Sequence, residues 1–346
     1  MSGQPPASKR PKLDAAAAAS PPPSGYGARV TLLLVGDIHG DPKELGGSDR
    51  EDRMNQLRAE LHASDNAFTA VLLNGDLANV PRPDAQNPEA SAHWLPWIAR
   101  QLEMAAGGFG REHAGEDPGP SRGDRRAYYV PGNHDPPQLF DEAQTAAAAA
   151  TKGCDALNSA TNLHGRVTRL APGLLIGGLG GSTPARQEGE GGALTQVWGG
   201  CPYNTEQEAA AVIQGKLAPA VEAALQPEDQ LLLMSHAGPD GVGTALHWRD
   251  VSKPPIRSGS TALTDYLRSP TAQQRFVGVV HGHTHPGGGQ GHIGALPVFN
   301  PGPLRDGAYA VLTLVRSEEE GQLRWRVAQY EQRRLSGCLH AASVAA

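Results

Sequence analysis

RVTLLLVGDIHG, residues 29–40, is the stretch that decides the fold. Its apolar run over residues 30–35 is rich in β-branched and leucine side chains and stops abruptly at Gly36. Such a run is typical of a buried strand. Two side chains that can bind metal ions, Asp37 and His39, follow directly. The stretch therefore predicts a strand whose carboxyl end carries chemically useful groups.

The same arrangement, an apolar run followed by metal-capable side chains, recurs along the chain. In open α/β sheets ligands gather at the carboxyl ends of strands, so groups far apart in sequence can meet there. Adjacent glycines allow the backbone to turn sharply at these ends. The further runs and their groups are 70–73 with Asp76, 127–130 with Asn133, His134 and Asp135, 231–234 with His236, and 276–280 with His283 and His285.

Strands that alternate with helices indicate an α/β domain. Helical periodicity, with apolar residues on one face, is predicted for residues 50–62, 94–104, 142–150 and 206–225. Further strands are predicted at residues 174–176, 296–299 and 308–315, with an edge strand at 323–330.

The chain is expected to hold one large domain, residues 29–334, between flexible ends. Pro, Ser, Gly and Ala dominate residues 1–28, which predicts a disordered extension. Residues 335–346 are predicted to be a flexible tail. Long loops are predicted at residues 79–92, 105–124 and 180–203.

Composition disfavours several classes of protein. A net charge of -6 gives no basic surface, so a nucleic-acid partner is not expected. No run of about 18 apolar residues could cross a bilayer, and no apolar secretory segment begins the chain. Three scattered cysteines suit a reducing compartment. We expect an intracellular protein, cytoplasmic or nuclear. A basic run over residues 6–14 fits either a nuclear import signal or a solvated patch.

The strand-end groups also define a metal chemistry. Two aspartates, one asparagine and four histidines are too many ligands for one tetrahedral ion, and they suit two ions bridged by a carboxylate. Imidazole and carboxylate ligands fit zinc, iron or manganese. Two divalent ions against two carboxylates leave about two positive charges, which match a phosphate group.

In order along the chain, GDIHG at 36–40, GD at 75–76, GNHD at 132–135, SH at 235–236 and GHTH at 282–285 resemble the motifs of the calcineurin-like metallophosphoesterase family. The resemblance implies a fold of two mixed β-sheets packed as a sandwich and flanked by helices. It also implies a centre of two divalent or trivalent ions of Mn, Fe or Zn. By position, its ligands would be Asp37, His39 and His285 for the first ion, Asn133, His236 and His283 for the second, and Asp76 for both.

The resemblance gives two further residues a catalytic role. His134 would lie beside the leaving group and donate a proton, and Asp135 would orient the ring of His134. Asn300 falls where members of the family often have an Asn-Pro-Gly turn that closes the site. His281 is expected to point away from the centre, because side chains alternate along a strand. Trp94 and Trp97 could cover a substrate pocket, but core packing of their helix is the favoured interpretation.

The sequence departs from the protein-phosphatase branch of this family. That branch has arginines after its second motif and before its third, where this chain has residues 77–80 and Pro131. A phosphoprotein substrate is therefore disfavoured, and a small phosphate ester is expected. Candidate replacements for these arginines are Arg305 or the group Arg122, Arg125 and Arg126.

The resemblance therefore predicts hydrolysis of phosphate monoesters or diesters by a hydroxide bridging two metal ions, with His134 as the proton donor. Monoesterase and phosphodiesterase activity are both open at this point, and so is the oligomeric state. The alternative is a catalytically inactive scaffold with the same fold that acts as a protein-interaction subunit. Loss of ligands would mark such a scaffold, and every motif ligand is present.

Overall fold

The computed structural model describes residues 29–40, 53–62, 68–107, 126–152, 154–189, 192–247, 253–319, 322–336 and 338. The predicted extension over residues 1–28 lies outside these ranges, as does most of the predicted tail over 335–346. The domain limits, the role of the basic run and the cellular location therefore stay predictions. Within the described ranges, no helix is long and apolar enough to span a membrane.

The first of two large sheets has six strands and is mixed. Its strands, in order across the sheet, are β16 (Gln322–Arg334), β15 (Ala308–Glu319), β1 (Arg29–Val35), β2 (Ala70–Leu73), β3 (Arg126–Tyr129) and β4 (Thr161–Asn162). β1, β2 and β3 run parallel, so their carboxyl ends lie at one edge. β15 pairs antiparallel with β1, and β16 forms the predicted edge strand.

The second sheet also has six strands and is mixed. Its strands, in order, are β13 (Gly289–Ile293), β14 (Leu296–Asn300), β12 (Phe276–Val280), β9 (Gln230–Ser235), β6 (Leu174–Leu179) and β5 (Arg166–Ala171). β6, β9, β12 and β14 run parallel. The outer strands β5 and β13 were not expected from the sequence, because their exposed positions and glycines weaken any apolar pattern.

The two sheets pack face to face. Leu32 and Leu34 of β1 share one buried cluster with Ile176 of β6 and Met234 of β9. Leu33 of β1 belongs instead to a cluster on the outer face of the first sheet. Because β1 is buried on both faces, its sequence is an uninterrupted apolar run. The predicted fold, two mixed sheets flanked by helices, is confirmed.

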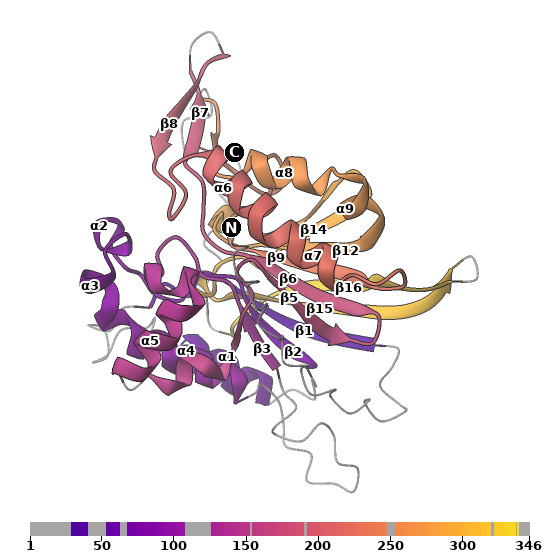
Figure 1. Ribbon diagram of the computed structural model, residues 1–346, viewed down its shortest axis with the longest axis horizontal. Coiled ribbons are helices and arrows are strands. Elements are labelled where there is room, and N and C mark those ends of the chain that lie inside the picture. Colours follow the sequence, from indigo (N-terminus) through magenta and orange to yellow (C-terminus); the bar gives the residue numbers. More distant parts are fainter. Residues whose placement is uncertain are drawn as a thin grey trace, which may run out of the picture.

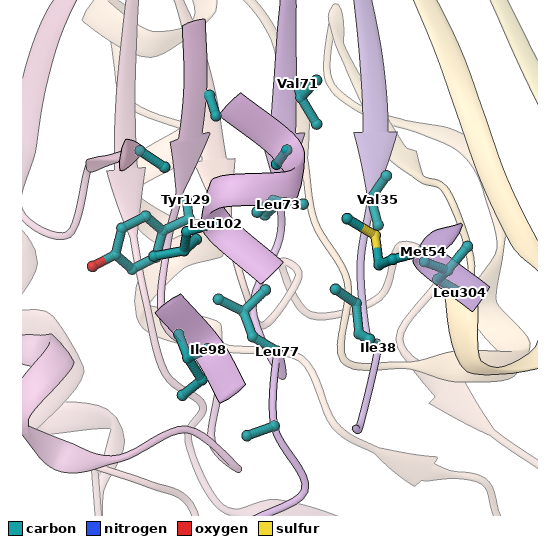
Figure 2. Close-up of a cluster of buried hydrophobic side chains, with 14 of the residues drawn as sticks. Val35, Ile38, Met54, Val71, Leu73, Leu77, Ile98, Leu102, Tyr129 and Leu304 are labelled. Atoms are coloured by element: carbon teal, nitrogen blue, oxygen red, sulfur yellow. The ribbon is translucent and has the colours of Figure 1, made fainter. Parts of the chain in front are cut away.

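Helices cover the outer face of the first sheet. Figure 1 shows α1 (Arg53–His62), α4 (Leu95–Ala106) and α5 (Glu142–Lys152) on this side. Figure 2 shows Ile98 and Leu102 of α4 lying over the sheet beside Leu73 and Tyr129, and all four are buried in one cluster. The apolar face of α4 thus accounts for its predicted periodicity.

A second group of helices covers the outer face of the second sheet (Figure 1). The predicted helix at 206–225 is helical over residues 206–224, with one π-turn, a local widening of the helix, in the middle. The elements on this face are α6 (Glu206–Val212), the π-turn (Ile213–Leu217), α7 (Ala218–Ala224), α8 (Thr261–Leu267) and α9 (Pro270–Arg275).

Two predicted loops contain regular structure, so those predictions are wrong. Residues 79–92 include the short helices α2 (Arg82–Ala85) and α3 (Pro88–Ser91). Each is too short to show helical periodicity. The side chain of Asn87 caps α3 by accepting hydrogen bonds from the backbone of Glu89 and Ala90. Most of the predicted loop over residues 105–124 lies outside the described residues.

Residues 180–203 form part of a small four-stranded sheet that projects from the molecule (Figure 1). Its strands are β10 (Ala245–Leu246), β11 (Ile256–Arg257), β7 (Ala185–Glu188) and β8 (Leu194–Trp198). No residue of β8 is buried. With neither face packed on a core, the strand shows no apolar alternation, so the sequence pattern did not reveal it.

Candidate metal centre

The predicted ligands come together where parallel strands of both sheets end. Asp37, Asp76 and Asn133 follow β1, β2 and β3 of the first sheet. His236 and His283 follow β9 and β12 of the second sheet. Each sheet therefore supplies its ligands from adjacent strands, as the strand-end pattern predicts.

The first cluster consists of Asp37, His39 and His285, whose ligand atoms all lie within 4.8 Å of one another. Nε2 of His39 lies 3.1 Å from Nε2 of His285, and the latter lies 3.5 Å from Oδ1 of Asp37. Two imidazole nitrogens and a carboxylate oxygen that converge in this way form a site for one cation.

The second cluster consists of Asp76, His236 and His283, again with ligand atoms within 4.8 Å of one another. Nε2 of His236 lies 2.9 Å from the side-chain oxygen of Asn133 and 3.4 Å from Oδ1 of Asp76. The structure thus brings Asn133 to this cluster, as predicted.

Asp76 lies between the two clusters. Its Oδ1 is 3.4 Å from Nε2 of His236, and its Oδ2 is 3.4 Å from Nε2 of His39. One carboxylate that offers an oxygen to each cluster has the arrangement of a bridging ligand.

The donor atoms fit two metal ions. Nε2 of His283 is buried and has no hydrogen-bond partner among the described residues. A buried polar atom without a partner costs about 1–3 kcal/mol, and coordination of a cation removes that cost. Nitrogen and oxygen donors without thiolate suit zinc, iron or manganese.

Backbone contacts fix the ring of His236. Its Nδ1 lies 2.8 Å from the carbonyl oxygen of Asn74. Because a carbonyl oxygen only accepts hydrogen bonds, this contact assigns the ring proton to Nδ1 and leaves the lone pair of Nε2 for a metal ion.

Four of the ligands have a strained backbone. Among the described non-glycine residues, only Asp37, His39, Asp76 and His283 have positive φ, between 50° and 66°. This left-handed conformation is unfavourable for residues with a Cβ. Backbone hydrogen bonds hold it in place: the amide of Asp37 donates to Gly75 at 3.0 Å, and that of His39 donates to Asp76 at 2.9 Å.

The electrostatics favour the protonation states that metal ligands need. Burial lowers the pKa of His39 to about 4 and that of His283 to about 3, so both rings are neutral near pH 7. Burial alone would raise the pKa of Asp37 and Asp76. The hydrogen bond and charge of His285 lower that of Asp37, and the charges of neighbouring histidines lower that of Asp76. Both carboxyl groups are therefore ionised.

His134 lies beside the first cluster. The centroid of its ring is 5.2 Å from that of His39. Its backbone amide donates to Oδ1 of Asp76 at 2.8 Å, and its Nδ1 lies 3.0 Å from the carbonyl oxygen of Val80. Since that carbonyl accepts, Nδ1 carries the proton and Nε2 is left for proton transfer.

The prediction that Asp135 orients His134 is wrong. The buried Asp135 carboxylate accepts hydrogen bonds from the amide of Gly132 at 2.7 Å and that of Ala78 at 3.0 Å. Burial, assisted by the charge of Asp76, raises the pKa of Asp135 to about 7. Asp135 therefore ties the turn after β3 to the segment after β2, and the backbone of Val80 orients His134. A carbonyl contact of this kind leaves no signature in residue type.

His281 and Trp97 lie where the sequence leads us to expect them. The buried His281 ring binds the carbonyl of Gly282 through Nδ1 at 3.1 Å and lines a separate cavity of about 380 Å³. It belongs to neither ligand cluster. Trp97 is buried in the core and donates to the carbonyl of Leu77 at 3.2 Å, so it packs beneath the site.

Two mixed sheets with two candidate metal clusters at their strand ends fit the calcineurin-like phosphoesterase fold. The family model described as calcineurin-like phosphoesterase matches residues 30–287, and the chain belongs to this family. Members of the family are generally hydrolases that depend on two metal ions.

Solved structures show the same fold at low sequence identity. One covers 89% of this chain and 100% of its own, with 14% identity and a TM-score of 0.54. The calcineurin-like phosphoesterase YfkN from Bacillus subtilis has 13% identity, coverage of 90% and 92%, and a TM-score of 0.43. A dimetal phosphatase from Danio rerio has 14% identity, coverage of 89% and 99%, and a TM-score of 0.43. No curated protein matches the chain.

Proposed function

We propose that this chain is a two-metal phosphoesterase that hydrolyses small-molecule phosphate esters. The observation that carries the proposal is the position of Asp76, with one carboxylate oxygen directed to each histidine-containing cluster. A buried carboxylate in this position is costly without cations, and one of the nitrogen donors around it, Nε2 of His283, has no hydrogen-bond partner among the described residues.

The candidate ligands form two sets, one for each ion. Asp37, His39 and His285 would hold one ion, and Asn133, His236 and His283 the other, with Asp76 shared. When bound, such ions polarise the phosphoryl group and lower the pKa of water, which supplies the nucleophile at neutral pH.

His134 would complete the reaction. Its Nδ1 proton is directed to the carbonyl of Val80, so the other ring nitrogen can carry a proton to the departing oxygen of the ester. The amide of His134 binds Asp76, which fixes the position of the ring relative to the shared ligand. A histidine held in this way acts as a general acid.

Where the protein-phosphatase branch has arginines, this chain has apolar residues, and this difference supports a small substrate. Leu77 and Val80, which follow Asp76, are buried in the core, and Pro131 precedes Gly132. None can provide the charged hydrogen bonds that would hold the phosphate of a phosphoprotein. We therefore propose small mono- or diesters as substrates.

The test uses purified full-length protein loaded with Mn²⁺. The wild type should hydrolyse p-nitrophenyl phosphate or bis-p-nitrophenyl phosphate, and the ratio of the two rates reports its preference. Asp76→Asn should lose at least about 100-fold of the activity, because changes merely adjacent to a metal ligand already cost 10- to 100-fold. Asp141→Asn is the matched control. Asp141 is exposed, and its side chain accepts from the amide of Gln144, which asparagine can also do.

Equal activity in the wild type and Asp76→Asn would contradict the proposal. The alternative, an inactive scaffold that binds other proteins, predicts less than one tightly bound metal ion per chain. Metal analysis after dialysis distinguishes the two.

A further inference from the structure

The turn after β14 lies against the first metal cluster. The amide of Leu304 donates to the carbonyl of Gly36 at 2.8 Å, and the amide of Arg305 donates to the carbonyl of Asp37 at 3.2 Å. Arg305 is thus bonded through its backbone to a residue that supplies a predicted metal ligand.

Asn300 holds the start of the same turn. Its Nδ2 donates to the carbonyl of Thr284 at 3.1 Å, and its Oδ1 accepts from the amide of Gly302 at 2.8 Å. Since Thr284 precedes the ligand His285, the turn is fastened to both segments that carry the first cluster. Its backbone is therefore preorganised, and the role predicted for the Asn-Pro-Gly turn has a structural basis.

The side chain of Arg305 remains available for a ligand. Within the described part of the chain, its guanidinium makes one ion pair, a 3.6 Å contact from Nε to Oδ1 of Asp306. The two side chains are 31% and 48% exposed, so water screens this pair and it contributes little.

Two other arginines of the described residues have strong carboxylate partners. Arg169 binds both carboxylate oxygens of Asp229 at 2.9 Å, and Arg186 binds Glu206 at 2.9 Å. Arg305, in contrast, is bonded through its backbone to the ligand residue Asp37, and the ion pair of its side chain within the described residues is the screened contact with Asp306.

The guanidinium of Arg305 is positively charged at neutral pH and lies close enough to His285 to interact with that ring electrostatically. A phosphate group held at the first cluster would therefore lie in the field of a positive side chain.

We propose that Arg305 binds an anionic oxygen of the substrate phosphate and thereby favours phosphate monoesters over diesters. The inference rests on the proposed function and deepens it. The protein-phosphatase branch has arginines where this chain has residues 77–80 and Pro131, so those two sources of phosphate-binding donors are missing. Arg305 would instead supply the planar pair of N–H donors to the phosphate. A monoester carries about two negative charges at neutral pH and a diester about one, so the monoester gains more.

The experiment measures binding of inorganic phosphate by isothermal titration calorimetry to full-length Mn²⁺-loaded protein, together with kcat and KM for both p-nitrophenyl esters. Arg305→Ala should weaken phosphate binding by about tenfold or more, the effect of one charge-assisted hydrogen bond. Its kcat/KM should fall more for the monoester than for the diester. Arg305→Lys should recover part of the loss, because it restores the charge without the planar donor pair.

Two variants serve as controls. Asp306→Asn removes the acidic partner of Arg305 and should leave phosphate binding unchanged or stronger. Arg324→Ala removes an exposed arginine from β16, whose guanidinium donates to the side chain of Gln322, and corrects for the change in net charge. Metal analysis of each variant shows whether the centre is still loaded.

Equal phosphate affinity in the wild type and Arg305→Ala overturns the inference, and so does a wild type that binds no phosphate. An equal loss in Asp306→Asn and Arg305→Ala also overturns it, since it assigns Arg305 a role in the turn alone. Failure of the proposed function appears differently: a wild type that binds metal and phosphate but hydrolyses neither ester leaves the role of Arg305 in binding intact.

Discussion

Asp76 and His134 are joined by a 2.8 Å hydrogen bond from the backbone amide of His134 to Oδ1 of Asp76. The shared metal ligand therefore also fixes the segment that carries the general acid. The contact connects the buried side chain of Asp76, at the end of β2, to the backbone of the turn after β3, so it fixes the position of that turn relative to the shared ligand. It separates the roles of the two residues, because a change of the His134 ring leaves this backbone bond intact.

His134→Asn should lower kcat by about 100-fold or more while both metal ions stay bound, because only the proton donor is lost. The loss should be smaller for p-nitrophenyl phosphate than for phenyl phosphate, since p-nitrophenolate leaves readily without a proton. Steady-state kinetics on both substrates, with metal analysis, checks this. An equal loss on the two substrates would contradict a proton-donor role.

Gly40→Ala should destabilise the protein by about 1–3 kcal/mol through overpacking. A Cβ at Gly40 would lie 2.1–2.5 Å from the indole ring of Trp97, which is buried and hydrogen-bonded to Leu77. Because Gly40 follows the ligand His39, metal affinity should fall as well. Urea unfolding and metal titration measure the two effects.

Gly215→Ala is the matched control for that change. Gly215 lies in the π-turn, and a Cβ there would meet nothing within 4 Å. Alanine at this position should stabilise the protein, by up to about 1 kcal/mol, through its higher helix propensity. Similar destabilisation by both alanine substitutions would argue against the steric explanation.

His164 should make stability depend on pH. Burial, assisted by the charge of Lys216, lowers its pKa to about 4, and its Nδ1 accepts a hydrogen bond from the amide of Gly180 at 3.0 Å. In the unfolded chain the pKa of a histidine is about 6.5, so the unfolded state binds the proton more strongly and stability falls as the pH falls from about 7 towards 4. This difference in proton binding lowers the free energy of unfolding by about 2 kcal/mol between pH 7 and pH 5.

The measurement compares the free energy of unfolding at pH 7 and pH 5 for the wild type and His164→Gln. Glutamine keeps a hydrogen-bond acceptor but has no titrating proton, so the variant should lose less stability on acidification. An identical pH dependence in the two proteins would rule out His164 as the source.

The strand-end pattern was sufficient to predict the ligand clusters. Asp37, Asp76 and His236 each follow an apolar run, and parallel pairing aligns the ends of β1 with β2 in the first sheet and of β9 with β12 in the second. The physical reason is that burial on both faces requires continuous apolar sequence, so the polar groups of Asp37, Asp76 and His236 begin only where the strands end.

The remaining features depend on contacts that residue type does not encode. Asp135 binds backbone amides rather than His134, and any residue at position 80 could supply the carbonyl that orients the ring. The small sheet with β8 and the short helices α2 and α3 lack a buried face of sufficient length to produce a periodic pattern.

The division of the ligands between the two sheets has a mechanical consequence. The second cluster takes Asp76 and Asn133 from one sheet and His236 and His283 from the other. A cation bound there would add coordinate bonds between layers that are joined by apolar packing and by contacts such as that of His236 with the carbonyl of Asn74. Movement of one sheet relative to the other would then require coordinate bonds to break, so bound metal would hold the two sheets in a fixed relative position.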